Sequence, residues 1–384
     1  MDKDILNSAV ALRHELHRHA ELSGQEKHTK AMLMDFLREN TSLELHDMGA
    51  WFYAAYRVSS DERTEAAAPR RIAFRADFDA LPIEDDAALP YASETHGVSH
   101  KCGHDGHSAA LCALALEIDR HGCRNDIFFL FQHAEETGCG APVCQRLITD
   151  EKIDIIFGWH NMPGFPVGSV AVHDGTAAFA SRGLVLSFFG KSSHASQPEN
   201  GHNPARAIAR LITDIPALTA REEHRGVVMA TVVCVRVGEE AFGTNAGFGQ
   251  LMLTIRAEFE SELDALDSEL CRRARAYAEQ DGIENVGAEY RDPFPETRNT
   301  PNAVSAVRRA RTECGLVEAH WDEPFRSSED FGCYTKLTDG ALFYIGCGVD
   351  HAKLHTREYD FNDAIIEPAV DMMLHLAETC ETNG

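Results

Sequence analysis

Apolar and polar positions along the first half of the chain follow helical and strand-like spacings in turn. Helical spacing covers residues 5–39, with an interruption at 22–24, which predicts two successive helices. Continuous apolar runs then predict buried strands, and an Ala/Leu-rich segment predicts a helix between them. These elements are expected as strands at 51–58, 71–75, 126–131 and 153–158, a polar loop at 59–69 and a helix at 108–120. Strands alternating with helices indicate an α/β sheet covered by helices.

From about residue 179 the order of elements changes to β-α-β-β-α-β, which is typical of a ferredoxin-like sandwich. Its strands are expected at 184–190, 227–237, 250–259 and 286–291, and its helices at 203–218 and 262–281. We therefore predict a complete inserted domain at 181–292. The α/β domain around it is split into 1–180 and 293–384, and it resumes with a helix at 302–314, a strand at 341–345 and a terminal helix from 365.

Composition narrows the class of protein. A chain of 384 residues suggests two domains, and 44% hydrophobic with 25% charged residues is typical of a globular enzyme. The net charge of −25 argues against nucleic acid as a partner, because phosphate binding needs a basic face. It equally gives no support for binding to an anionic membrane.

The 11 cysteines are scattered and odd in number, which favours reduced thiols over a disulfide framework. The polar, amphipathic start has no basic tip followed by an apolar core, so no signal peptide is evident. No apolar run approaches the roughly 20 residues that span a bilayer. A cytoplasmic protein is expected.

The densest set of metal-competent side chains is His-Lys-Cys-Gly-His-Asp-Gly-His at 100–107. It places a thiol, imidazoles and a carboxylate directly before a predicted helix, and thiolate and imidazole are usual ligands of zinc-like ions. Gly103 and Gly106 let the backbone turn closely enough for Cys102 and His104 to reach one site. The alternative, an incidental polar loop, is disfavoured by the density of donors.

Further donors follow apolar runs. Glu135 and Glu136 follow the predicted strand at 126–131, and sites in open α/β sheets gather at the carboxyl ends of strands. Such carboxylates are not readily desolvated without a cation. His160 also follows an apolar run, where a lone histidine is more often structural, and His355 alone is uninformative. The convergence of these positions predicts a metal site.

These stretches resemble the amidohydrolase family that includes hippurate hydrolase, bacterial N-acyl-amino-acid amidohydrolases and plant auxin-conjugate hydrolases. The matching segments, in the family's order, are RADFDALPIED at 75–85, HKCGHDGH at 100–107, FQHAEETGCGA at 131–141, GWHNMPGFPVGSV at 158–170, GKSSHASQPENGHNPA at 190–205, SSEDFG at 327–332 and LHTREYDFND at 354–363. The resemblance implies a split catalytic domain with a mixed, mostly parallel sheet, and an inserted ferredoxin-like lid that also mediates dimerisation.

The resemblance also assigns roles. The implied metal ligands are Cys102, His104, Glu136, His160 and His355, with Cys102 bridging two ions. Glu135 becomes the general base, and Asp77 or Asp105 orients the ligands. His194, in the lid, would reach the substrate carbonyl, and in a dimer it could come from the partner subunit. The other interpretation of His194 is a surface-loop histidine.

One segment departs from the family pattern. Family members carry Asn-Val-Ile-Pro before a lid strand ending in Thr-Ile-Arg, whereas this chain has Gly-Thr-Asn-Ala-Gly-Phe-Gly at 243–249. Asn245 and Arg256 are retained as candidates for gripping the substrate's carboxylate or amide. The loop reads as shorter, which bears on substrate class and leaves the metal chemistry untouched.

The expected reaction is metal-dependent hydrolysis of the amide bond of N-acyl amino acids, either hippurate-like or other acyl and aryl conjugates. Two divalent ions per subunit are expected, and a mixed site of this kind suits zinc, manganese, cobalt or nickel. A homodimer through the lid is expected. One alternative is a dipeptidase or carboxypeptidase of the same clan. A non-catalytic metal-binding homologue is the other, and the presence of Glu135 and His194 disfavours it.

Overall fold

The computed structural model describes residues 1–59, 69–86, 88–321 and 323–380. The chain forms two compact units, which we call the outer unit (1–177, 297–323 and 330–384) and the inserted unit (178–296 and 324–329). The segment 324–329 belongs to the inserted unit although it follows the predicted insertion in sequence. Most of the polar loop expected at 59–69 lies outside the described residues.

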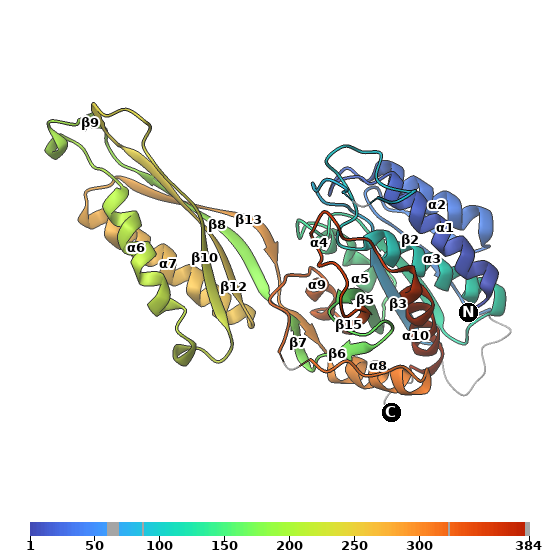
Figure 1. The fold of residues 1–384 in the computed structure, drawn as a ribbon. Coiled ribbons are helices and arrows are strands. Elements are labelled where there is room, and N and C mark those ends of the chain that lie inside the picture. Colours follow the sequence, from blue (N-terminus) through green and yellow to red (C-terminus); the bar gives the residue numbers. More distant parts are fainter. Residues whose placement is uncertain (60–68, 87, 322, 381–384) are drawn as a thin grey trace. The chain divides into compact units, whose positions relative to one another are not determined.

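A seven-stranded mixed sheet forms the centre of the outer unit (Figure 1). Its order is β1 (Glu44–Asp47), β2 (Phe52–Tyr56), β4 (Asp126–Gln132), β3 (Arg71–Asp77), β5 (Ile155–Pro163), β15 (Asp339–Gly348) and β6 (Val170–Val172). The four central strands run parallel, and the outermost pairings are antiparallel. The predicted mixed α/β sheet is therefore confirmed.

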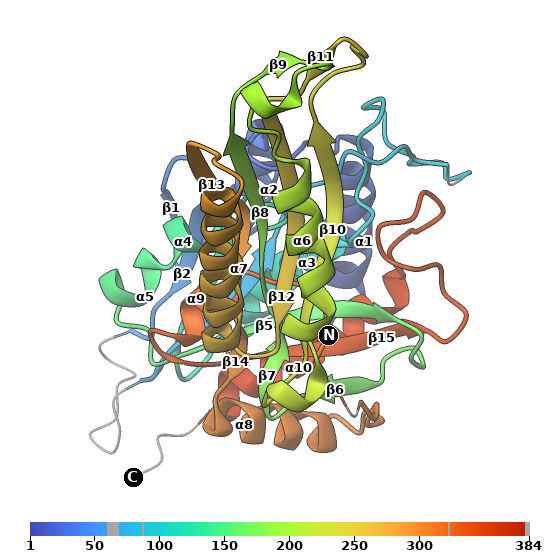
Figure 2. The same cartoon turned by 90° about the vertical axis from the view of Figure 1, so that its left-hand side faces the viewer.

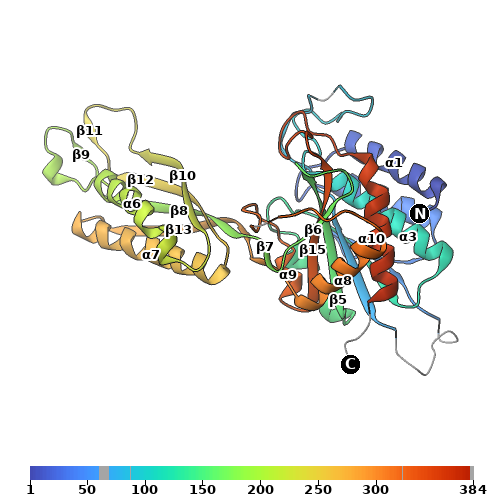
Figure 3. The same cartoon turned by 60° about the horizontal axis from the view of Figure 1, so that its bottom comes forward.

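Long helices pack against one face of this sheet. They are α1 (Lys3–Arg18), α2 (Lys27–Asn40), α3 (His104–His121), α8 (Pro301–Glu313) and α10 (Ile366–Thr379), with α8 and α10 visible beside the strands in Figure 3. The apolar side chains of Phe74, Phe129 and Phe157 meet these helices in one core. The opposite face carries Phe331, whose ring would lie 2.7 Å from a Cβ at Gly158.

The shorter elements were not foreseen, because a few residues give no measurable periodicity. They include α4 (Ala141–Cys144), α5 (Arg146–Asp150), α9 (Gly332–Thr335), β7 (Gly175–Ala178) and β14 (Thr297–Asn299), with single 3₁₀ turns at Pro198–Asn200, Arg221–Glu223 and Asp363–Ile365. Several predicted boundaries differ from the observed ones, and one of these differences bears on the site. The strand expected to end at residue 158 continues to Pro163, since β5 pairs with β15 along its whole length, so His160 lies within the strand.

The inserted unit is a ferredoxin-like sandwich, as predicted. Its elements are β8 (Ala180–Phe189), α6 (Ala205–Leu218), β10 (Val228–Val237), β12 (Phe248–Ala257), α7 (Glu260–Gln280) and β13 (Asn285–Phe294). The antiparallel sheet has the order β10-β12-β8-β13, and both helices lie over one face (Figure 2). Alternate residues of β12 are buried against them, while the others face away from the helices. A small second sheet pairs β9 (Ser193–His194) with β11 (Thr244–Asn245).

Buried ion pairs join distant parts of the outer unit. The guanidinium of Arg13 on α1 is fully buried and lies 2.8 Å from carboxylate oxygens of both Asp360 and Asp363, just before α10. His17, one turn further along α1, contacts Asp105 at 2.9 Å and Asp85 at 3.1 Å. These contacts fix α1 to the segments that lead into α3 and α10. Among the described residues, no helix combines the length and the apolar character needed to cross a bilayer.

Candidate metal centre

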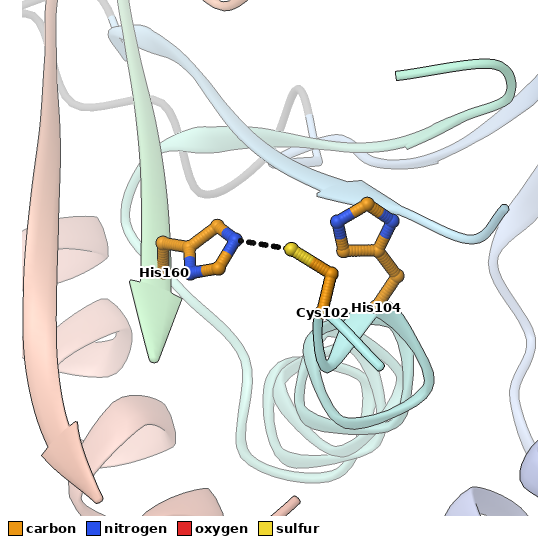
Figure 4. A group of neighbouring side chains, drawn as sticks. All are labelled: Cys102, His104 and His160. Carbon is orange, nitrogen blue, oxygen red and sulfur yellow. Dashed lines mark hydrogen bonds between the residues drawn. The ribbon is translucent and has the colours of Figure 1, made fainter. Parts of the chain in front are cut away.

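Cys102, His104 and His160 meet where the loop before α3 faces β5 (Figure 4). Gly103 precedes α3 with a left-handed φ of 101°, which only glycine adopts at low cost. This bend sends the Cys102 side chain towards β5, where its Sγ lies 3.4 Å from Nε2 of His160. The donor atoms of all three residues lie within 4.8 Å of one another.

The donor atoms of the other predicted ligands, Glu136 and His355, lie within 4.8 Å of the same thiol. Nε2 of His355 lies 3.3 Å from Sγ of Cys102 and 3.5 Å from Oε1 of Glu136. His355 adopts a left-handed φ of 60°, and its amide donates to the carbonyl of Lys101 at 2.8 Å. Cys102 is thus common to two donor groups, one with His104 and His160 and one with Glu136 and His355.

Hydrogen bonds on the far side of two imidazoles leave their Nε2 atoms available. Nδ1 of His104 lies 3.1 Å from both the carbonyl and a carboxylate oxygen of Asp79, and Nδ1 of His160 lies 2.8 Å from the carbonyl of Asn161. Since only an N–H satisfies these acceptors, the lone pairs at Nε2 face the cluster.

Two buried atoms of the cluster have no hydrogen-bond partner among the described residues, Nε2 of His104 and Oε1 of Glu136. They lie 3.8 Å apart, and leaving such groups unsatisfied is costly. Thiol, imidazole and carboxylate donors around orphaned lone pairs fit borderline divalent ions such as zinc. The residues present therefore fit a metal centre.

The electrostatics of the site agree with this fit. Burial and the nearby carboxylates of Glu136 and Glu135 raise the pKa of the Cys102 thiol well above its usual value. Burial alone would lower the pKa of His104, but Asp77, Asp79 and Glu136 raise it to about 10. A cation would replace both protons, because metal ligation needs the thiolate and the neutral imidazole.

Glu135 lies beside the ligands and is 5% exposed. Its carboxylate is within 4.8 Å of donor atoms of His104 and Glu136, and it accepts a hydrogen bond of 3.4 Å from the amide of Asp330. Asp330 comes from SSEDFG and is itself held by Arg75 at 3.0 Å and Gln132 at 2.7 Å. The SSEDFG motif, to which the sequence assigned no role, therefore contacts Glu135, the proposed base.

Of the two aspartates expected to orient the ligands, the structure places only Asp77 next to the cluster. Asp77 lies 2.6 Å from Nδ1 of His107 and 3.7 Å from Nε2 of His104. Asp105 points to His17 and Arg13. Sequence reasoning missed Asp79, which contacts His104 and also accepts from the amide of Glu136 at 3.0 Å. Its signal was its place in RADFDALPIED, two residues after Asp77.

The candidate residues of the inserted unit fall into two places. His194 is exposed, and the Ser196 amide donates to its Nδ1 at 3.1 Å, so its Nε2–H is free to donate. Asn245 pairs with Ser193 and accepts from Asn203 at 2.8 Å. Arg256, near the other end of β12, donates to Oγ of Ser328 at 2.6 Å.

Thiol, imidazole and carboxylate donors beside a buried glutamate, gathered near the carboxyl ends of parallel strands, are the arrangement expected of a metal-dependent hydrolase. Comparison with known families agrees, since the sequence model of Peptidase family M20/M25/M40 matches residues 73–379. The chain belongs to this family. The resemblance inferred from the motifs is thereby confirmed.

Individual relatives are similar along their whole length. The N-acetyldiaminopimelate deacetylase of Bacillus subtilis (strain 168) is 28% identical over 380 residues, covering 96% of this chain and 97% of that protein. A Bacillus subtilis protein described as a dinuclear metal binding peptidase of the M20 family superposes with a TM-score of 0.81 at 23% identity, covering 98% of each chain. The aminobenzoyl-glutamate utilization protein of Klebsiella pneumoniae gives 0.71 at 18%, covering 98% and 96%. Both structures show the shared fold.

Proposed function

We propose that this protein hydrolyses the amide bond of N-acyl amino acids, using two divalent ions per subunit. The observation that supports the proposal is the shared thiol of Cys102, which joins two donor groups beside the buried Glu135. His104 and His160 would complete one metal site, and Glu136 and His355 the other. The ions, when bound, supply Lewis-acid activation of the attacking water and the scissile carbonyl.

The chain's own residues would move the protons. Glu135 takes a proton from the attacking water and returns it to the departing amine, which requires a carboxylate close to the ligands and shielded from solvent. His194 donates from Nε2 to the carbonyl oxygen as negative charge develops there. Asn245 and Arg256 bind the carboxylate or amide of the substrate. Asp77 and Asp79 hold the imidazoles in place.

The geometry of the inserted unit supports a homodimer. Ten residues lie between Asn245 and Arg256, and β12 alone extends about 26 Å from Phe248 to Arg256 at roughly 3.3 Å per residue. An amino-acid conjugate is too short to touch both ends within one subunit. If both ends bind substrate, His194 and Asn245 must reach the site of a second copy.

The surface for that second copy would be the edge strand β10. It ends the sheet order β10-β12-β8-β13, and Val232, Val233 and Val235 are 38%, 63% and 45% exposed. An edge of this length and apolar character needs cover, and a second copy can pair with it. Light scattering should show a dimer that Val233→Lys converts to monomer.

The reduced thiols are consistent with a cytoplasmic location, which we also propose.

The direct test is elemental analysis of the purified protein, followed by turnover with each metal restored. The panel should contain N-acetyl amino acids, including N-acetyldiaminopimelate because of the relative's name, together with hippurate and dipeptides. We expect release of free amino acid from the acylated substrates and little from dipeptides. Preferential cleavage of dipeptides would instead support the peptidase alternative.

A further inference from the structure

The connection between α1 and α2 lies directly against the loops that carry the donors. Leu22 forms a bridge with Ala80, and the amide of Ala80 donates to the carbonyl of Glu21 at 2.9 Å. Ser23 donates to a carboxylate oxygen of Asp79 at 2.6 Å. The sequence showed this segment only as an interruption between two helices.

Glu26, the last residue of the connection, reaches the loop after β4. Its Oε1 accepts from the amide of Ala134 at 2.8 Å, and the two residues are 5% and 3% exposed. A buried amide left without an acceptor is unfavourable, because its hydrogen bond to water is not replaced. The contact therefore holds the backbone immediately before Glu135.

That backbone is in an unfavourable conformation. Ala134 has a φ of 48°, a left-handed value that is strained for a residue with a Cβ. Its carbonyl accepts from the amides of Cys139 and Gly140, at 3.1 and 3.0 Å, which closes the loop around Glu135. The residue directly before Glu135 is therefore both strained and held by hydrogen bonds at its amide and its carbonyl.

We propose that Glu26 is a positioning residue for the reaction, holding Ala134 in its left-handed conformation so that Glu135 points at the reacting water. The inference rests on the proposed role of Glu135 as general base. Glu26 contacts Ala134 and not the five donors, so it acts through the backbone. A displacement of about 1 Å at a reacting group can lower turnover 10²-fold.

The first test compares Glu26→Ala with Glu26→Gln. Burial raises the pKa of Glu26 to about 7, and a carboxyl oxygen accepts the Ala134 bond in either protonation state, so Gln preserves the contact. We expect Glu26→Ala to lower kcat about 30-fold, with KM and metal content unchanged, and Glu26→Gln to stay within about 3-fold of the parent. Equal losses in both variants, or loss of metal, would overturn the proposal.

The second test uses Ala134→Gly, because glycine adopts a positive φ without the Cβ penalty. In the Glu26→Ala background it should recover about 5-fold of the lost kcat, and no recovery would contradict a role through Ala134. Glu21→Ala is the matched control, since Glu21 contacts Thr29 and should lower the melting temperature while leaving kcat unchanged.

A readout independent of turnover separates this inference from the proposed function. Hydrogen exchange of peptides covering 130–140 should show the Ala134 amide exchanging faster in Glu26→Ala than in the parent. Unchanged exchange would overturn the positioning role. Full turnover of Glu135→Gln would instead remove the proposed base and leave the exchange result standing.

Discussion

The outer and inserted units hold their candidate residues in opposite ways. In the outer unit the donors lie within 4.8 Å of their neighbours, and most are buried and held by further hydrogen bonds. In the inserted unit His194 is exposed, and Arg256 lies near the far end of the strand that follows Asn245. The outer unit therefore brings its candidate ligands together by itself, whereas the roles proposed for the residues of the inserted unit depend on a substrate and a second copy.

The largest loss of activity should come from a change at Glu135, the buried glutamate of the outer unit. Glu135→Gln removes the proposed base while preserving the size of the side chain, so we expect kcat to fall at least about 10³-fold with the metal content unchanged. Turnover assays and elemental analysis of the same preparation test this. Substantial turnover in the variant would remove Glu135 from its proposed role.

The next largest loss of activity should come from a change at His194, the exposed histidine of the inserted unit. His194→Ala removes the donor proposed for the developing oxyanion, and we expect a loss of kcat of about 10²-fold to 10³-fold. Mixing His194→Ala with Glu135→Gln subunits creates dimers in which one site has both residues, if His194 acts across subunits. Recovery to roughly a quarter of parental activity is then expected in the mixture. A mixture no more active than its components would place His194 within its own subunit's site.

The pH dependence of the free energy of unfolding should likewise distinguish a buried histidine from a partly exposed one. Burial would lower the pKa of His17, but hydrogen bonds to Asp105 and Asp85 raise it to about 9. This stabilisation is complete below about pH 6.5 and is lost as pH rises through about 9, amounting to at most about 3 kcal/mol at 1.36 kcal/mol per pKa unit. Urea unfolding between pH 6 and 10 should show this fall in the parent and not in His17→Gln. The partly exposed His14 supplies the control variant, His14→Gln, which should keep the parental slope.

The smallest expected effect is a loss of metal affinity when the hydrogen bond that orients a metal ligand is weakened. Asp79→Asn weakens the contact to Nδ1 of His104 without touching Nε2, so metal affinity should fall about tenfold. Competition with a chromophoric chelator measures it. Asp105→Asn, which removes a carboxylate facing away from the donors, should leave metal affinity unchanged.

The sequence predicted the parts of the molecule that repeat a period or match a motif. The central strands of the two large sheets were foreseen from strand spacing, whereas the edge strands β1 and β6 and the two small two-stranded sheets were not. The five candidate ligands were found through their motifs and do come together. Glu26 was not foreseen, because its contact with Ala134 joins residues 108 positions apart and leaves no local pattern. Asp79 was hidden for a similar reason, since only the fold shows which aspartate of RADFDALPIED faces His104.

The ion pairs of Arg13 bear on the order in which parts of the chain can fold during synthesis on the ribosome. The first helix finds its partners, Asp360 and Asp363, 347 and 350 residues later. The core of the inserted unit is drawn from an unbroken stretch of chain, so it can close while synthesis continues. We expect α1 to dock first on α3 and the segment around Asp85, and the ion pairs of Arg13, like the donor group that includes His355, to form only when nearly the whole polypeptide has been made.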